Sequence, residues 1–184
     1  MKKIGYMGIP LSNSENASGL FAEKFNMEAE HIPLTSAEGV VEALLKGEID
    51  YGVLATRNIV AGAVLETEEA LRRGKFRIVD EIGIPIHHCV FVKKENVHVN
   101  EVASHIQALG QTEKNLDRLF PGVKKTETED TALAAEMLAD GRLPENTAVI
   151  CGMSAGMHHG LVLLKSNIED NRENTTYFAL IENC

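Results

Sequence analysis

The segment SAEGVVEALLKGEIDYGVLA, residues 36–55, places a helical pattern directly before a strand pattern. Ser36 is a preferred helix N-cap residue, and Gly47 is a typical helix stop. Between them the apolar side chains recur at helical spacing on one face: Val40, Val41, Leu44 and Leu45. Residues 50–55 then form an apolar run that predicts a buried strand. A helix that leads into a buried strand indicates a parallel α/β fold.

The same alternation continues on both sides of this segment. Residues 3–8 predict a first strand and residues 14–25 a helix. Further along, helical patterns at 65–73, 106–120, 130–139 and 155–160 alternate with extended patterns at 102–104, 124–128, 147–151, 161–164 and 176–181. Residues 76–92 are extended but bent at Gly83 and Pro85, as expected for a crossover between two lobes. We expect two similar α/β lobes, with a ligand where strand ends of both lobes meet.

Composition and charge exclude several classes of protein. The 184 residues are 44% hydrophobic and 24% charged, which is ordinary for a globular chain with one core or two small lobes. The net charge of -9, with scattered Lys and Arg, argues against nucleic-acid binding. An anionic ligand would therefore need local positive charge.

The N-terminus and the cysteines indicate a cytoplasmic protein with reduced thiols. The apolar run after Met1 is interrupted by Gly5, Gly8 and Pro10, so it is too short for a signal-peptide core or a membrane span. The three cysteines, Cys89, Cys151 and Cys184, are odd in number and lack CxxC spacing, so neither a disulfide framework nor a zinc ribbon is expected.

Several motifs, in this order, resemble the catalytic domain of the prephenate dehydratase family. Residues 104–109, Ser-His-Ile-Gln-Ala-Leu, differ from the family's Ser-His-Pro-Gln-Ala-Leu only at Ile106, and residues 174–178, Asn-Thr-Thr-Tyr-Phe, stand where the family has Asn-x-Thr-Arg-Phe. Weaker matches are residues 4–8, 48–53, 87–89, 159–161 and 167–170. Together the matches span nearly the whole chain.

This resemblance implies a two-lobed periplasmic-binding-protein-like (type II) α/β fold with the substrate in the cleft between the lobes. We expect residues 1–80 and 158–184 to form lobe 1 and residues 81–157 to form lobe 2. Because the sequence stops at Cys184, the family's C-terminal ACT domain is expected to be absent. Family members associate through their catalytic domains, so the resemblance also implies a homodimer.

The implied activity is the conversion of prephenate to phenylpyruvate, carbon dioxide and water in phenylalanine biosynthesis, without a cofactor or metal. By its match to the family threonine, Thr176 is the candidate catalytic proton donor to the departing hydroxyl. The other candidate substrate-binding residues come from the matched or substituted motif positions: Ser12, Arg57, Asn58, Ser104, His105, Gln107, Thr175, Tyr177 and Phe178. The ligand class is a small anionic acid, with no nucleic-acid or membrane partner. Without the resemblance, a strand threonine such as Thr176 would be interpreted as structural.

The departures from the family motifs keep other functions open. Residues 8–15, Gly-Ile-Pro-Leu-Ser-Asn-Ser-Glu, lack the family's Gly-Thr pair, and Ser12 or Ser14 could substitute for it. Residues 55–59, Ala-Thr-Arg-Asn-Ile, replace Pro-Ile-Glu-Asn-Ser and retain only Asn58. Arg57 stands where the family has an acid, and Tyr177 stands where the family has an arginine. These opposite charge changes are expected if the two positions are neighbours. The guanidinium of Arg57 could also bind a carboxylate through two parallel hydrogen bonds. The alternatives are an enzyme that only decarboxylates prephenate and a non-catalytic module that binds small anions.

The adjacent histidines and Cys89 are interpreted as structural residues. The adjacent pairs His87-His88 and His158-His159 diverge on a strand or helix and lack metal-ligand spacing. Cys89 lies in an apolar strand without a base beside it, so a buried inert thiol is expected there.

Overall fold

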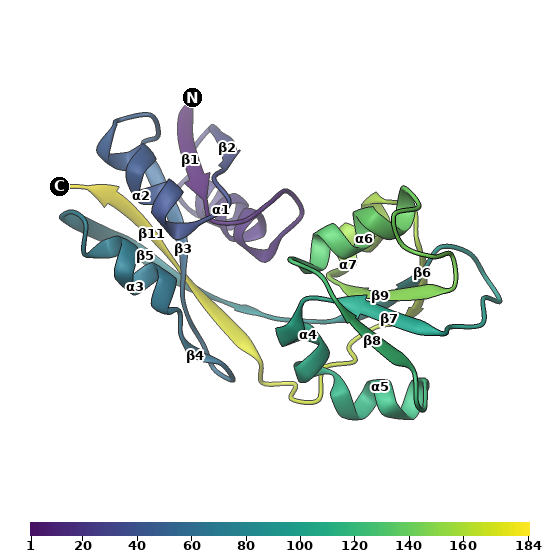
Figure 1. Ribbon diagram of the computed structural model, residues 1–184. Helices are drawn as coiled ribbons and strands as arrows, with labels where there is room; N and C mark the ends of the chain where they lie inside the picture. The colour runs from purple at the N-terminus through teal and green to yellow at the C-terminus, as the bar shows by residue number, and fades with distance from the viewer. The chain divides into compact units, whose positions relative to one another are not determined.

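The computed structural model describes all 184 residues, which form two compact α/β units (Figure 1). The first unit contains Met1–Ile86 and Glu173–Cys184, and the second contains His87–Arg172. The chain therefore passes between the units after residues 86 and 172, whereas we expected the boundaries after residues 80 and 157. β5 (Phe76–Pro85) pairs along its length with β11 (Thr175–Asn183), which keeps residues 81–86 in the first unit. β10 (Val162–Lys165) pairs with β6 (Cys89–Val92), which keeps that strand in the second unit.

The first unit is built on one sheet of six strands. Its other elements are β1 (Lys2–Tyr6), α1 (Asn13–Lys24), β2 (Ala29–Pro33), α2 (Ala37–Leu45), β3 (Tyr51–Asn58), β4 (Gly62–Ala63) and α3 (Leu65–Leu71). The strand order is β2-β1-β3-β11-β5, with β4 paired to β3. β1 runs parallel to β2 and β3, whereas β11 runs antiparallel to β3 and β5. The parallel α/β pattern predicted from residues 36–55 is therefore present, with an antiparallel return by the C-terminal strand.

Helices cover both faces of this sheet. One face packs against α1, in a cluster of buried residues that includes Ile4, Tyr6, Phe21, Phe178 and Leu180. The other face packs against α2, in a cluster that includes Val40, Leu44, Leu54, Ala179 and Ile181. The predicted helix after Ser36 is confirmed, since the Ser36 hydroxyl accepts the Gly39 N–H at 3.0 Å. Leu45, the last residue of this helix and expected on its apolar face, is instead 45% exposed.

The second unit has a five-stranded sheet in the order β10-β6-β9-β7-β8. Its elements are β6, β7 (Glu101–Ser104), α4 (Ile106–Gln111), α5 (Glu113–Leu119), β8 (Lys124–Glu127), α6 (Thr131–Ala139), β9 (Thr147–Cys151), α7 (Met153–His158) and β10. The single helix expected over residues 106–120 is two helices. Thr112 separates them, and its hydroxyl donates to the Ala108 carbonyl at 2.7 Å, a local bond that often bends helices.

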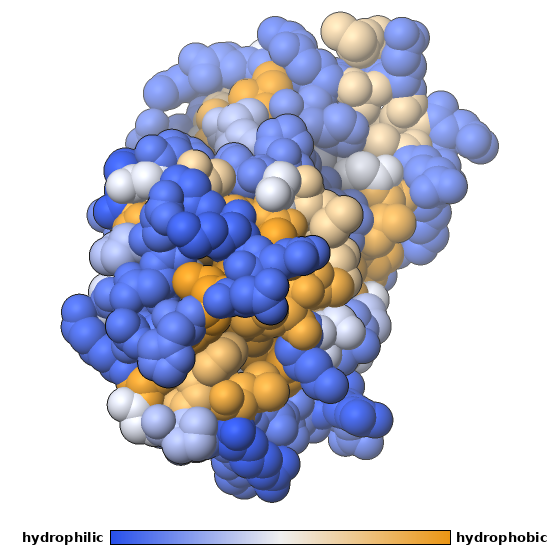
Figure 2. All heavy atoms as spheres, turned by 90° about the vertical axis from the view of Figure 1, so that its right-hand side faces the viewer, coloured by the Kyte–Doolittle hydropathy of each residue, from blue (hydrophilic) through white to orange (hydrophobic).

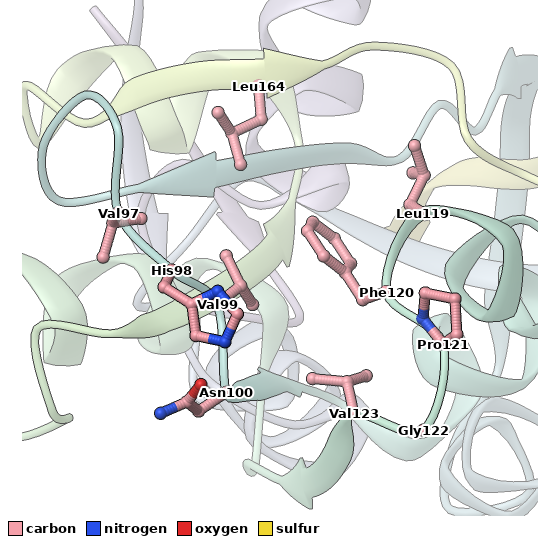
Figure 3. Close-up of a pocket in the computed structure, with 10 residues that line it drawn as sticks. All are labelled: Val97, His98, Val99, Asn100, Leu119, Phe120, Pro121, Gly122, Val123 and Leu164. Carbon is pink, nitrogen blue, oxygen red and sulfur yellow. The ribbon is translucent and has the colours of Figure 1, made fainter.

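A groove lined by both polar and apolar atoms lies on the surface of the second unit. Figure 2 shows hydrophobic side chains gathered on a face of this unit. The groove has a volume of about 590 Å³ and lies between the β6–β7 connection, the turn after α5 and β10 (Figure 3). Its apolar lining includes Val97, Val99, Phe120, Val123 and Leu164. None of the predicted site residues lines it. No helix of the chain is both long enough and apolar enough to cross a bilayer.

Candidate active site

A β-bulge in β3 shapes the site in the first unit. Thr176 pairs with Asn58 and Tyr177 with Arg57, but Phe178 pairs with Ala55, so Thr56 is an extra residue with no register partner on β11. Its hydroxyl oxygen lies 3.2 Å from the Tyr177 carbonyl oxygen. Such an extra residue reverses the alternation of the bulged strand, so the side chains beyond it change faces. The bulge thereby sets which of the predicted site residues share a face of the sheet.

The pairing puts Thr176 and Tyr177 on opposite faces. β11 has no extra residue, so its side chains alternate, with Phe178 and Leu180 in the cluster under α1 and Ala179 in the cluster under α2. Thr176 therefore faces the α1 side together with Asn58, whose Nδ2 lies 2.8 Å from Thr176 Oγ1. Tyr177 and Arg57 face the other side.

The loop before α1 lies at the carboxyl end of β1 and is held in shape by Glu15. Its carboxylate accepts the Leu11 N–H at 2.7 Å and the Tyr6 hydroxyl at 3.2 Å. Burial raises the pKa of Tyr6, and the charge of Glu15 raises it further, so Tyr6 stays neutral. Ser12 is the N-cap of α1 and accepts the Glu15 N–H at 3.4 Å. Leu11 has a φ of 68°, a left-handed conformation that this network stabilises.

Arg57 and Tyr177 are neighbours, as predicted from their exchanged charges. The guanidinium carbon of Arg57 lies 3.5 Å from the centre of the Tyr177 ring, a cation–π contact. Arg57 Nη2 also lies 4.0 Å from Glu81 Oε2, and the Thr56 hydroxyl donates to Glu81 Oε1 at 2.9 Å. Gly83 pairs with Tyr177, where a Cβ would meet the Tyr177 ring at 3.1 Å. Arg57 is thus engaged on the face opposite Thr176.

Two of the predicted substrate-binding residues have structural roles instead. Phe178 is 2% exposed and packs in the core under α1, because strand alternation turns it inwards. Ser104 is fully buried, and its hydroxyl donates to the Ile150 carbonyl at 2.6 Å at the end of β7. Neither side chain has surface to offer a ligand.

The remaining candidates are at least partly accessible. In the second unit, His105 is half-buried at the N-cap of α4, where its Nδ1 accepts the Gln107 N–H at 3.3 Å, and the Gln107 side chain is exposed. In the first unit, Thr175 is half-buried, and its carbonyl accepts the Ile59 N–H at 2.9 Å.

Glu169 and the His87-His88 pair form a hydrogen-bonded network in the second unit that our sequence interpretation missed. Glu169 and His88 are buried, whereas His87 is exposed. Glu169 is 4% exposed, and its carboxylate lies 2.8 Å from His87 Nδ1 and accepts the His88 backbone N–H at 3.1 Å. His88 Nε2 lies 2.8 Å from Gln111 Oε1. Burial alone would raise the pKa of Glu169, but hydrogen bonds from His87 and the His88 N–H hold it below its usual value. The motif matches at residues 87–89 and 167–170 were the sequence signals for this network.

This network predicts a pH dependence of stability. Burial lowers the pKa of His88 below its ordinary value of 6.5, so the unfolded chain takes up this proton first as the pH falls. The contribution of neutral His88 to folding stability is therefore fully present above about pH 6.5, and it is lost as the pH falls from there through the pKa of His88 in the folded protein. We expect a lower urea midpoint at pH 5.5 than at pH 7.5. His88→Gln should reduce this difference, and an unchanged difference in that variant would assign it to other groups.

Two of the three cysteines, Cys89 and Cys151, are buried thiols. Cys89 is buried, as expected, and pairs across β6 and β9 with buried Cys151. Burial raises the pKa of Cys89 and raises that of Cys151 to about 12, so both stay as thiols. No group of three or more His, Cys, Asp or Glu side chains is arranged to hold a metal ion.

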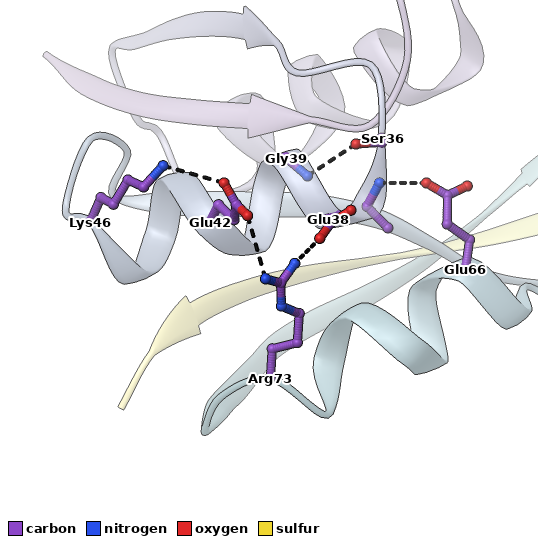
Figure 4. A network of polar contacts seen from close by, with 8 residues as sticks. Ser36, Glu38, Gly39, Glu42, Lys46, Glu66 and Arg73 are labelled. Atoms are coloured by element: carbon purple, nitrogen blue, oxygen red, sulfur yellow. Dashed lines mark hydrogen bonds and ion pairs between the residues drawn. The ribbon is translucent and has the colours of Figure 1, made fainter.

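The guanidinium of Arg73 in the first unit is neutralised by acidic residues of a neighbouring helix. Arg73, which follows α3, pairs with Glu38 and with Glu42, the latter at 3.4 Å (Figure 4). Glu66 accepts the Ala37 N–H at 2.8 Å, which ties α3 to the start of α2. Arg73 therefore joins the two helices and is not a free charge for an anionic ligand.

Comparison with known proteins identifies the relatives of this chain. The family model for prephenate dehydratase matches residues 4–184. "Arogenate dehydratase/prephenate dehydratase 6, chloroplastic" from Arabidopsis thaliana is 32% identical over 183 residues, which cover 97% of this chain and 43% of that protein. The chain thus spans less than half the length of such curated relatives.

Solved structures share the fold. The prephenate dehydratase of Arthrobacter aurescens in complex with L-Phe superposes with a TM-score of 0.88 at 24% identity, covering 99% of this chain and 60% of that one. A periplasmic substrate-binding protein of an ABC transporter from Coxiella burnetii gives a TM-score of 0.52 at 13% identity, covering 100% of this chain and 84% of that one. The expected periplasmic-binding-protein-like type II fold is confirmed.

Proposed function

Because this chain belongs to the prephenate dehydratase family, we propose that it converts prephenate to phenylpyruvate, carbon dioxide and water. The observation that carries the proposal is the contact between Asn58 and Thr176, two retained motif residues that lie 2.8 Å apart on one face of the sheet. The changed positions, Arg57 and Tyr177, lie on the other face and leave this pair intact.

The reaction needs a proton donor at the departing hydroxyl. The bond to the ring carboxylate breaks, its electron pair enters the ring as the ring becomes aromatic, and the hydroxyl leaves with the electrons of its C–O bond. Thr176 is half-buried on a strand, and its hydroxyl passes a proton to the leaving oxygen, which departs as water, while solvent returns a proton to Thr176 Oγ1. No redox change of the protein is involved in this scheme.

The substrate carboxylates need hydrogen-bond donors. The N-terminus of α1 offers backbone N–H groups next to Ser12, and the positive end of a helix favours anions. Because α1 packs on the face that carries Thr176, we assign one carboxylate to this helix end and to the Ser12 hydroxyl. In the second unit, His105 and Gln107 stay candidates for substrate contact because their side chains are accessible.

Product analysis tests this proposal. Purified protein is incubated with prephenate, and separately with arogenate, the substrate named in plant relatives. We expect phenylpyruvate from prephenate. Carbon dioxide together with a product that retains its hydroxyl would instead indicate an enzyme that only decarboxylates. Binding without turnover of either acid would reject the enzymatic proposal in favour of a small-anion binding module.

Arg57 is expected to have little effect on substrate binding. Since its guanidinium stacks on Tyr177 on the face opposite Thr176, we infer that Arg57→Ala changes KM less than about twofold. Loss of the exposed cation–π contact should cost about 0.5–1 kcal/mol of folding free energy. Steady-state kinetics and urea unfolding measure the two effects. A tenfold rise in KM with normal stability would make Arg57 a carboxylate ligand after all.

A homodimer and a cytoplasmic location complete the proposal. Exposed apolar side chains of the second unit, among them Leu119 and Leu164, support association, because burial of apolar surface drives most protein–protein contacts. The free cysteines support a reducing compartment. Light scattering of the purified protein measures its oligomeric state. Microscopy of a tagged chain in cells determines its location.

A further inference from the structure

The side-chain amide of Asn58 has only one orientation compatible with its neighbours. One amide atom faces the backbone N–H groups of Val60 and Ala61, each at 2.9 Å. A backbone N–H can only donate, so the atom facing these two groups must be the oxygen, Oδ1. The amide nitrogen is thereby directed to the other side, towards Asn174 and Thr176.

This orientation fixes the direction of the hydrogen bond to Thr176. Asn58 Nδ2 carries two hydrogens, and it lies 2.8 Å from Asn174 Oδ1 and 2.8 Å from Thr176 Oγ1. An amide nitrogen does not accept hydrogen bonds, so Thr176 Oγ1 must be the acceptor. The hydrogen of the Thr176 hydroxyl cannot point at Asn58 and is left to donate elsewhere.

The same contacts leave Asn58 without spare hydrogen-bonding capacity. Both amide hydrogens are used by Asn174 and Thr176, and the oxygen already accepts two backbone N–H groups. Asn58 is therefore not free to bind a substrate carboxylate, the role that its motif position suggested. An accepted hydrogen bond also polarises the Thr176 O–H bond, which strengthens it as a donor.

We infer that Asn58 is a positioning residue that makes the Thr176 hydroxyl a hydrogen-bond donor towards the substrate. This inference rests on the proposed function, because it gives Asn58 a task in the departure of the hydroxyl. The backbone at Val60 and Ala61 contributes to this arrangement. Its two N–H groups fix the orientation of the Asn58 amide, and the amide in turn fixes the direction of the Thr176 hydroxyl.

Asn58→Asp tests the inference with nearly unchanged shape. The carboxylate still accepts the Val60 and Ala61 N–H groups, but its second oxygen can only accept, so the Thr176 hydroxyl turns towards it. We expect kcat for prephenate to fall about 100-fold at pH 8, the low end of the effect of general-acid catalysis. Charge repulsion of an anionic substrate would act on KM, whereas a misdirected hydroxyl acts on kcat.

The pH profile gives the readout that a structural role would not produce. Once protonated, the new carboxyl group of the Asn58→Asp variant donates to Thr176 Oγ1 again, so the ratio of wild-type to variant kcat should shrink as the pH is lowered from 8 to 5. Asn183→Asp makes the same chemical change at the exposed end of β11 and should keep wild-type kinetics throughout. A kcat for Asn58→Asp within threefold of wild type at pH 8, or a loss that does not depend on pH, would overturn the inference.

A second measurement separates this inference from the proposed function. If the wild-type protein turns over neither prephenate nor arogenate, the proposed function fails but the orientation of the hydroxyl can still be observed. Neutron diffraction of the deuterated wild-type protein should show the Thr176 hydroxyl deuteron directed away from Asn58. A deuteron between Thr176 Oγ1 and an Asn58 oxygen would overturn the inference whatever the activity.

Discussion

Replacing Thr176 with valine is expected to lower kcat for prephenate by about 10²–10⁴-fold, the usual contribution of a positioned general acid. Valine keeps the β-branched shape that suits a strand, so β11 and its pairing with Asn58 stay in place. The substrate carboxylates bind elsewhere in this proposal, so KM should change less than threefold. The loss of the acceptor for Asn58 Nδ2 should also cost about 1 kcal/mol of folding free energy.

The matched control is Thr176→Ser, which retains the hydroxyl. Because serine can make the same bond from Asn58 Nδ2, kcat should stay within about tenfold of wild type. Steady-state kinetics of the three proteins, with unfolding curves to confirm that each is folded, make the comparison. Turnover by Thr176→Val within threefold of wild type would reject Thr176 as the donor.

Replacing Phe178 with alanine is expected to destabilise the protein by about 3–5 kcal/mol. Phe178 is among the largest fully enclosed side chains, and it packs with Ile4, Tyr6 and Phe21 between the sheet and α1. Its removal leaves a cavity that the two layers cannot close, because packed interiors relax only partly. Urea unfolding monitored by circular dichroism measures the loss.

Two variants make this prediction specific. Phe178→Leu keeps most of the buried volume and should lose less than the alanine variant. Ile78→Ala on β5 removes a side chain that is 61% exposed, so its effect should stay within about 0.5 kcal/mol. If Phe178→Ala kept wild-type stability and raised KM, Phe178 would be a substrate contact, as its motif position suggested, and its assignment to the core would be wrong.

The pattern of residues 36–55 determined a large part of the fold by itself. An N-cap serine, apolar side chains at helical spacing and a following apolar run act through local backbone and burial preferences, so the helix and strand could be predicted. The retained motif around Thr176 likewise located the candidate donor. Both signals are local, which is why they could be recognised before any packing was known.

Contacts between distant segments decided the rest. The split of the expected helix at Thr112 and the unit boundaries at Ile86 and Glu173 depend on hydrogen bonds and strand pairing that no local pattern announces. Burial of Ser104 and Phe178 likewise follows from which side of a strand faces the core.

Strand pairing also decided which candidate site residues lie on the same face of the sheet. Only the bulge at Thr56 puts Asn58 beside Thr176 and turns Arg57 towards Tyr177. The sequence therefore determined which residues are candidates for the chemistry, and the tertiary structure decided which of them meet. The physical reason is that the pairing register of two strands fixes the face of every side chain along them.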